Sequence, residues 1–184
     1  HNFTVSDEEE IYHYNVTVYD VVGHYNSTLT RNITLDSLNP LVINPQVNDS
    51  DSIVRKTDSI RINVSVDDVN IDTVNVSHMD SLSMERVTDL IWEIDTNATE
   101  LGCTQIDDTC VLNFTAIDFA GNMNDTTTKN LIIDDKNPSI QNLLSNDTDN
   151  VTRNDLVLNF TVYATDTNGL EVSLNGTPMV LSGD

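Results

Sequence analysis

Apolar and polar residues alternate along several short stretches of the chain. The clearest are residues 60–66 (IRINVSV) and 112–117 (LNFTAI), and residues 14–19 (YNVTVY) and 158–163 (LNFTVY) repeat the pattern. A period of two places every second side chain on one face, which predicts β-strands with one buried face. No segment keeps a helical period over 11 residues, and residues 83–90 come nearest to one short helical turn. The alternation therefore predicts an all-β fold.

The chain also contains an internal repeat. Residues 14–40 align without a gap with residues 112–138, at an offset of 98. The matched positions include Asn15/Asn113, Thr17/Thr115, Asp20/Asp118, Gly23/Gly121, Asn32/Asn130, Asp36/Asp134 and the dipeptides Asn39-Pro40/Asn137-Pro138. A second match, at an offset of 96, pairs residues 60–66 with 156–162 and residues 74–77 with 170–173. The period is therefore about 98 residues.

The Asn-Pro dipeptides at 39–40 and 137–138 mark the boundaries of the repeat, because proline ends strand pairing and stiffens a linker. One whole unit then spans residues 39–136. Residues 1–38 form the C-terminal half of a preceding unit, and residues 137–184 form the N-terminal half of a following one. We expect a window on a longer array, with one complete unit between two partial units.

Seven strands are predicted in the complete unit, near residues 41–45, 52–56, 59–67, 71–77, 88–94, 110–118 and 127–134. Seven short strands in about 98 residues are typical of an immunoglobulin-like β-sandwich. The inward positions predict a core made of Ile62, Val64, Val66, Ile91 or Trp92, Leu112, Phe114 and Ala116. In the tight connection at 118–122, we expect Gly121 to adopt a backbone angle that other residues avoid.

The residues that follow the alternating strand at 112–117 carry a family resemblance. The run Asp-Phe-Ala-Gly-Asn at 118–122, a last strand and then Asp-Asp-Lys-Asn-Pro resemble the end of a bacterial or archaeal Ig-like surface repeat. The first copy keeps Asp20 and Gly23 but has His24 where the family usually has Asn. The resemblance implies tandem Ig-like repeats of an extracellular protein, as in adhesin stalks, surface layers and filaments.

Glycosylation sequons are far more frequent than composition explains. Fourteen of the 23 asparagines begin Asn-X-Ser/Thr, where chance predicts about four or five. They are Asn2, Asn15, Asn26, Asn32, Asn48, Asn63, Asn75, Asn97, Asn113, Asn124, Asn146, Asn150, Asn159 and Asn175. A strand with Asn and Thr on its solvent face also produces this motif without any glycan, an alternative that fits Asn15, Asn63, Asn113 and Asn159. Those in turns favour N-linked glycans on several sites.

Cys103 and Cys110 are the only two cysteines. Six residues separate them, with two aspartates in the turn, which favours a small disulfide-closed loop; two reduced thiols are the alternative. A zinc site needs two more soft ligands, and a redox pair has the spacing Cys-X-X-Cys. The predicted disulfide implies an oxidising, extracellular location.

Acidic residues gather at the unit boundaries and suggest cation sites. Asp134, Asp135 and Asn137 lie at one boundary, and Asp36 and Asn39 match them at the other. Strand ends that approach a boundary carry Asp67, Asp68 and Asp166. Hard oxygen ligands at such junctions suit Ca²⁺. The alternative is that aspartate fills turns and keeps a long rod soluble.

The charge excludes several classes of partner. Asp and Glu number 30 against 8 Lys and Arg, a net charge of −22. Nucleic acids and anionic membrane surfaces both need a basic face, and no apolar run approaches the ~18 residues of a membrane span. The sequence has no nucleophile elbow, phosphate loop or HExxH motif, and its four histidines are scattered. We therefore predict no enzyme and no membrane insertion.

Together these features predict a non-enzymatic structural segment of a glycosylated extracellular fibre, stalk or surface layer. Its expected partners are copies of itself or adjacent repeats of the same polypeptide. The alternatives are a ligand-binding adhesin region and the accessory β-sandwich of a secreted hydrolase. The partial units are complementary, since residues 1–38 hold late strands and residues 139–184 hold early ones. We expect neighbouring repeats to complete both, with residues 14–18 beside the equivalents of 156–162.

Overall fold

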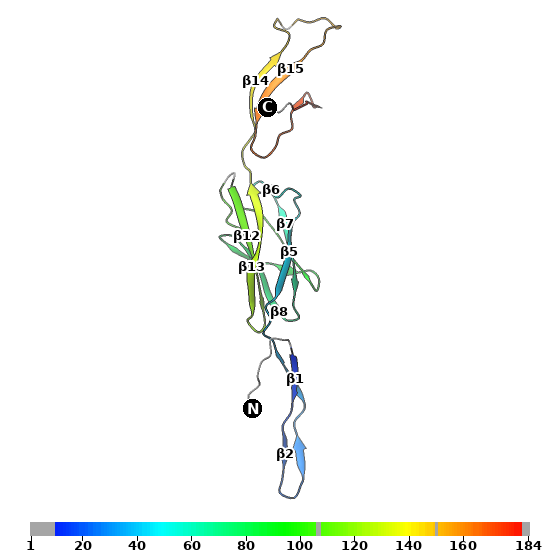
Figure 1. The fold of residues 1–184 in the computed structure, drawn as a ribbon, viewed down its shortest axis with the longest axis vertical. Coiled ribbons are helices and arrows are strands. Elements are labelled where there is room, and N and C mark those ends of the chain that lie inside the picture. Colours follow the sequence, from blue (N-terminus) through cyan, green and yellow to red (C-terminus); the bar gives the residue numbers. More distant parts are fainter. Residues whose placement is uncertain (1–9, 106–107, 150, 182–184) are drawn as a thin grey trace.

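The structure is a computed structural model, and it describes residues 10–105, 108–149 and 151–181. These residues form strands and turns, with no helix among them. Figure 1 shows a two-stranded ribbon at one end, a central body of two sheets, and a second small set of strands at the other end. The chain passes through these parts in sequence order. Because the described residues contain strands and no helix, the all-β prediction is confirmed.

The central body consists of two sheets. The first has the order β10-β11-β7-β5, with bounds Glu85–Arg86, Ile91–Thr96, Ile60–Asp67 and Leu41–Val47. The second has the order β6-β13-β12-β8-β9, with bounds Ile53–Val54, Met123–Ile133, Asp108–Asp118, Ile71–Ser77 and Ser81–Ser83. All pairs are antiparallel except β6 with β13. The arrangement is compatible with a β-sandwich.

One apolar core lies between these sheets, and it is built from the inward positions of the alternating strands. Every predicted core position is buried: Ile62, Val64, Val66, Trp92, Leu112, Phe114 and Ala116, with Ile91 half-buried beside Trp92. Val74 and Val76 of β8, and Leu131 and Ile133 of β13, complete the same cluster. Burial of branched apolar side chains on both sheets holds the central body together.

The seven predicted strands of the central unit all have counterparts, and residues 83–90, the stretch nearest to a helical turn in sequence, form no helix. This segment contains the last residue of β9 (Ser81–Ser83) and the short strand β10. Between them Met84 is buried, and its backbone N–H donates to the carbonyl oxygen of Val74 at 2.8 Å. The chain crosses here from one sheet to the other. That long-range bond overrides the weak local helical pattern.

The N-terminal part is a long antiparallel ribbon. Strand β1 (Glu10–Tyr14) pairs with β4 (Arg31–Leu35), and β2 (Thr17–Tyr19) pairs with β3 (Tyr25–Ser27). The register of β1 with β4 repeats that of β12 with β13 at an offset of 98. The sequence repeat is thus also a repeat of strand pairing.

The C-terminal part repeats the early strands of the central unit. Strand β14 (Ser139–Ser145) pairs with β15 (Phe160–Thr165), and β16 (Ser173–Leu174) pairs with β17 (Thr177–Pro178). Every pair between β14 and β15 matches a pair between β5 and β7 at an offset of 98, including the register shift. Asn44 and Asn142 both have a left-handed backbone at that shift, with φ of 54° and 53°.

The offset of 96 that the sequence suggested for the C-terminal part is wrong, because the strand pairs repeat at 98. Every pair between β14 and β15 lies 98 residues after a pair between β5 and β7. The hairpin that follows is shorter than its counterpart, because Met84 donates to Val74 and Met179 donates to Val172, so the acceptors are 98 residues apart and the donors 95. Side chains alternate with a period of two, so a shift of two residues leaves every inward position inward. The hydrophobic pattern therefore fits both offsets, and only the pairing register distinguishes them.

The core position of Phe114 predicts a large loss of stability on truncation. Phe114→Ala is expected to lower the free energy of unfolding of the central unit by about 3–5 kcal/mol, because it leaves a cavity. Trp92 is the only tryptophan and lies in that core, so its fluorescence during urea unfolding reports this unit. Phe119→Ala, at an exposed loop position, is the control and should change stability by less than about 0.5 kcal/mol. Equal losses would contradict the assignment of the core.

Candidate functional site

The turn after β12 is closed by a buried carboxylate. Asp118 is 2% exposed. Its Oδ1 accepts a hydrogen bond from the backbone N–H of Asn122 at 2.8 Å, and its Oδ2 accepts one from Nδ2 of Asn122 at 2.8 Å. Gly121 has φ of +91°, as predicted, and its N–H donates to the Asp118 carbonyl. The turn thus presents the Asn122 amide to the segment that enters the unit.

That entering segment is fixed to the unit at Asp36. Nδ2 of Asn122 donates to the carbonyl oxygen of Asp36 at 3.2 Å. Nδ2 of Asn70, in the turn between β7 and β8, donates to Oδ2 of Asp36 at 3.2 Å. The backbone N–H of Asn70 in turn donates to Asp68 at 2.7 Å. Two loops of the central unit therefore hold the linker by asparagine amides.

Three carboxylates meet at this junction, which we call the acidic junction: Asp36, Asp68 and Asp118. One oxygen of each lies within 4.8 Å of the others. Burial and the charges of Asp36 and Asp118 raise the pKa of Asp68. Burial also opposes ionisation of Asp118, but hydrogen bonds from Asn122 and neighbouring backbone N–H groups outweigh it and lower its pKa. Ionisation of Asp68 therefore opposes folding of the unit, whereas ionisation of Asp118 favours it.

The acidic junction has the ligand chemistry that Ca²⁺ prefers, and two asparagine amides already satisfy part of it. Of the expected cation ligands, Asp36 lies in the junction, together with Asp68, which was noted at a strand end. Asn39 is exposed and outside the carboxylate cluster. Asp118 was expected only as a turn residue. The repeat of Asp at 20 and 118 was the signal for it, although nothing in the sequence showed that it would meet Asp36.

A matching junction follows the central unit. Oδ2 of Asp134 accepts a hydrogen bond from Nδ2 of Asn168 at 2.8 Å, and Oδ1 of Asp166 accepts one from the Asn168 backbone at 3.0 Å. These residues correspond to Asp36, Asn70 and Asp68 at an offset of 98. The bond from Asn168 lowers the pKa of Asp134. Asp135 points elsewhere, because it accepts from the backbone N–H of Lys56 and pairs with its ammonium group at 3.7 Å.

The N-terminal ribbon contains a turn that corresponds to the Asp118–Asn122 turn of the acidic junction. Oδ1 of Asp20 accepts from the backbone N–H of His24 at 2.8 Å, and its Oδ2 bonds Nδ1 of His24 at 2.8 Å. Gly23 has φ of +94°. The His24 ring thus occupies the place that the Asn122 amide takes in the central unit. The turn keeps its shape although the residue at this position differs.

The sequons that the structure describes are all accessible. None of the twelve asparagines is buried: Asn15, Asn26, Asn32, Asn48, Asn146, Asn159 and Asn175 are exposed, and Asn63, Asn75, Asn97, Asn113 and Asn124 are half-buried. Asn2 and Asn150 lie outside the described residues. Accessibility is a requirement for glycosylation, and occupancy of the sites stays a prediction.

The predicted disulfide is confirmed. Cys103 and Cys110 are bonded, with their Cα atoms 5.7 Å apart, and both are buried. Cys103 lies in the loop between β11 and β12, and Cys110 lies in β12 itself. His78 lies near both sulfur atoms. Because the sulfurs are consumed in the disulfide, this group is not a thiolate metal site. The bond closes a loop that enters β12, the central strand of its sheet.

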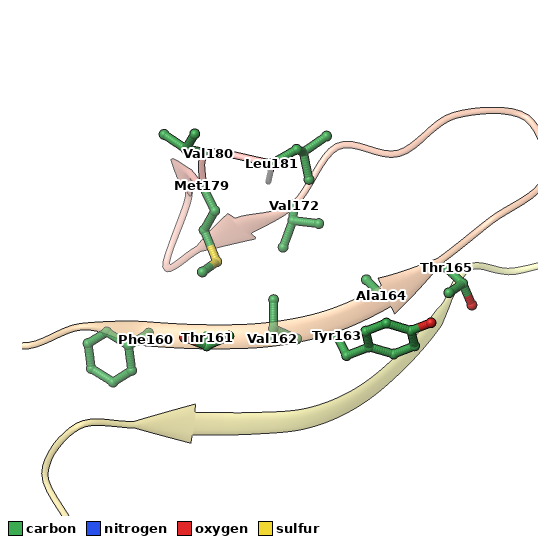
Figure 2. Close-up of a pocket in the computed structure, with 10 residues that line it drawn as sticks. All are labelled: Phe160, Thr161, Val162, Tyr163, Ala164, Thr165, Val172, Met179, Val180 and Leu181. Carbon is green, nitrogen blue, oxygen red and sulfur yellow. The ribbon is translucent and has the colours of Figure 1, made fainter. Parts of the chain in front are cut away.

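Apolar faces stand open in both partial units. A cavity of about 520 Å³ lies between β15 and the β16–β17 hairpin. In Figure 2, Val162 of β15 points across this space toward Val172 and Met179 of the hairpin. In the N-terminal ribbon, Val16 and Val18 are also largely exposed. Both partial units therefore expose apolar side chains on a strand face.

Comparison with known protein families and with curated proteins finds no match for this chain. Among the described residues, no helix has the length and apolar character needed to cross a membrane. The site must therefore be interpreted from its own residues.

Relief of charge repulsion at the acidic junction should stabilise the central unit. Asp68→Asn keeps an acceptor for Asn70 and removes one of three like charges, so in chelator at pH 7 we expect a gain of up to about 1 kcal/mol. The raised pKa of Asp68 means that ionisation costs stability as pH rises through that pKa. The gain should therefore disappear below about pH 4. Thermal unfolding measures it.

The control is Asp67→Asn, which removes the same charge next to the junction and should have a smaller effect. If Ca²⁺ binds there, millimolar Ca²⁺ should raise the melting temperature of the wild-type chain more than that of Asp68→Asn. If Ca²⁺ changes the melting temperature of neither protein, the asparagine amide bonds hold this junction without a cation.

Proposed function

We propose that this chain is a non-enzymatic structural segment of an extracellular, N-glycosylated surface fibre, stalk or layer built from tandem Ig-like repeats. The observation that carries the proposal is the repeated junction. The junction at the start of the central unit contains Asp36, Asp68 and Asn70, and the junction that follows the unit contains their counterparts Asp134, Asp166 and Asn168. In both, the asparagine amide donates a hydrogen bond to the linker carboxylate. A linker fixed in the same way at each unit spaces the units regularly.

The strand order supports an Ig-like unit. In Ig-like sandwiches one sheet has the order A-B-E-D and the other contains C, F and G. Numbering β5, β7, β8, β11, β12 and β13 as A, B, C, E, F and G reproduces both sheets, with β10 as strand D. The disulfide differs from that of antibody domains, because it joins Cys110 of β12 to Cys103 in the preceding loop and does not join the two sheets.

Location outside the cell is supported by two independent features. A disulfide persists in an oxidising compartment, and the twelve described sequons are all accessible. On β7 and β12 the sequons Asn63 and Asn113 lie on the face opposite the core. Glycans at these positions would cover the outside of the sandwich without disturbing its interior. They would also increase the solubility of a long rod.

Intact-mass and glycopeptide analysis of the protein from its native source tests the glycosylated part of this proposal. Several sequons should carry hexose-rich additions, including sites in turns such as Asn48 and Asn146. Material from a host without the glycosylation pathway serves as the unmodified mass reference. A native polypeptide that shows only the mass of its amino acids would exclude a glycoprotein.

The junction bonds make a second prediction, about stiffness. Asn70→Ala and Asn168→Ala each remove the amide that binds a linker carboxylate. Each substitution should therefore widen the range of bend angles at one junction. Particle images and small-angle scattering of the 184-residue chain should show a wider range of end-to-end distances. Asn154→Ala, at an exposed loop position, is the control and should leave the distribution unchanged. If all variants have the same distribution of end-to-end distances as the wild-type chain, the junction bonds do not control the spacing of the units.

A further inference from the structure

The central unit shows how the two halves of a repeat pack against each other. Its late strand β12 pairs with the early strand β8, with Phe114 opposite Val76 and Ala116 opposite Val74. The same face of β12 shares one core with β7. The partial units hold the equivalents of these elements at opposite ends of the molecule, as Figure 1 shows. Each end therefore displays one half of a contact whose complete form is visible in the middle.

The N-terminal ribbon exposes the residues that this contact requires. Val16 and Val18 are 60% and 66% exposed, whereas their counterparts Phe114 and Ala116 are fully buried. Val21 is fully exposed, but its counterpart Phe119 is exposed as well. Val16 and Val18 thus occupy repeat positions that are buried in the central unit, whereas Val21 occupies a position that is exposed there.

The C-terminal part exposes the complementary face. Phe160 is 39% exposed, whereas its counterpart Ile62 is fully buried. The cavity of about 520 Å³ beside it is lined by Val162, Val172 and Met179, which Figure 2 shows on the two facing elements. In the central unit the counterparts Val64 and Val74 are buried in one cluster with the inward side chains of β12. The cavity therefore has the position and the lining to receive the ribbon's valines.

We propose that the ribbon formed by β1–β4 of one copy docks on β15 and β16 of a second copy and completes an Ig-like unit between two chains. The inference rests on the proposed repeat architecture and adds the partner and the register. An offset of 98 places Val16 opposite Leu174, Thr17 opposite Ser173 and Val18 opposite Val172. Such a contact is heterologous, because the two surfaces differ, and it therefore propagates into an open filament.

The docked arrangement also completes the second acidic junction. In the central unit the turn of Asp118 and Asn122 lies against Asp36. The same offset brings Asp20 and His24 of the incoming ribbon against Asp134 of the receiving chain. All three elements of the central junction are then present, two from one chain and one from its neighbour. The net charge of −22 opposes this approach, so association should strengthen with salt, which shortens the Debye length to about 3 Å at 1 M.

Pairwise cysteine substitution tests the register directly. In Thr17→Cys with Ser173→Cys, the two thiols lie opposite each other on the solvent face, and oxidation at 1 M salt should give a ladder of covalent oligomers. Thr17→Cys with Glu171→Cys is the matched control. It is the pair that an offset of 96 would place opposite, on the same face but two residues away. A stronger ladder from the control pair would overturn the proposed register.

Sedimentation of the unsubstituted chain and of two variants tests the interface. Val18→Asp would bury an unpaired charge, so it should weaken self-association by more than about tenfold. Val21→Asp makes the same substitution at a position that stays in solvent and should leave association unchanged. Both should keep the wild-type unfolding of the central unit by Trp92 fluorescence, because neither touches its core.

A wild-type chain that stays monomeric at 1 M salt and millimolar concentration would overturn the proposed contact. Equal weakening by both aspartate variants would do the same, since it would indicate unspecific apolar aggregation. Neither result would affect the repeat architecture or the glycoprotein proposal, which the junction variants and the native mass test separately.

Discussion

Everything in this molecule depends on covering one apolar face of the strand β7 and its counterpart β15. In the central unit the late strand β12 supplies the cover, and Val64 and Phe114 become fully buried. In the C-terminal part no described late strand is present, and Phe160 stays partly exposed. Among the described residues, the central body and the C-terminal part therefore differ by one layer of the same core. A sheet with an uncovered apolar face and free edges favours addition of further strands.

The sequence predicted this core well because alternation reports directly on which face of a strand is buried. It predicted the strands β7, β8 and β12 and the left-handed Gly121. It did not predict the offset of the C-terminal part, since a two-residue shift preserves the face of every side chain. At residues 83–90, where the local pattern was ambiguous, a hydrogen bond between Met84 and Val74 determines the path of the chain.

The candidate site was predicted only in part, for a related reason. Local composition marked Asp36 and Asp68 as acidic residues near a boundary. It could not bring them together with Asp118, because that contact depends on two turns from different strand pairs ending at the same edge of the sandwich. Asn70 and Asn122, which hold the linker, were not predicted as site residues, because an asparagine in a turn is ordinary. Their role appears only when the side-chain amides are seen to donate to Asp36.

Folding and assembly in such a chain rest on the same interaction. Ala116 and Val18 occupy the same repeat position. Ala116 is a core residue of the central unit, and Val18 is an interface residue in the proposed contact. An unpaired charge at this position should unfold the unit in the first case and separate two chains in the second. The free energy that stabilises one unit is thus of the same kind as that which would join two molecules. Because the sequon Asn113 lies on the face of β12 opposite Phe114 and Ala116, a glycan there need not disturb this contact.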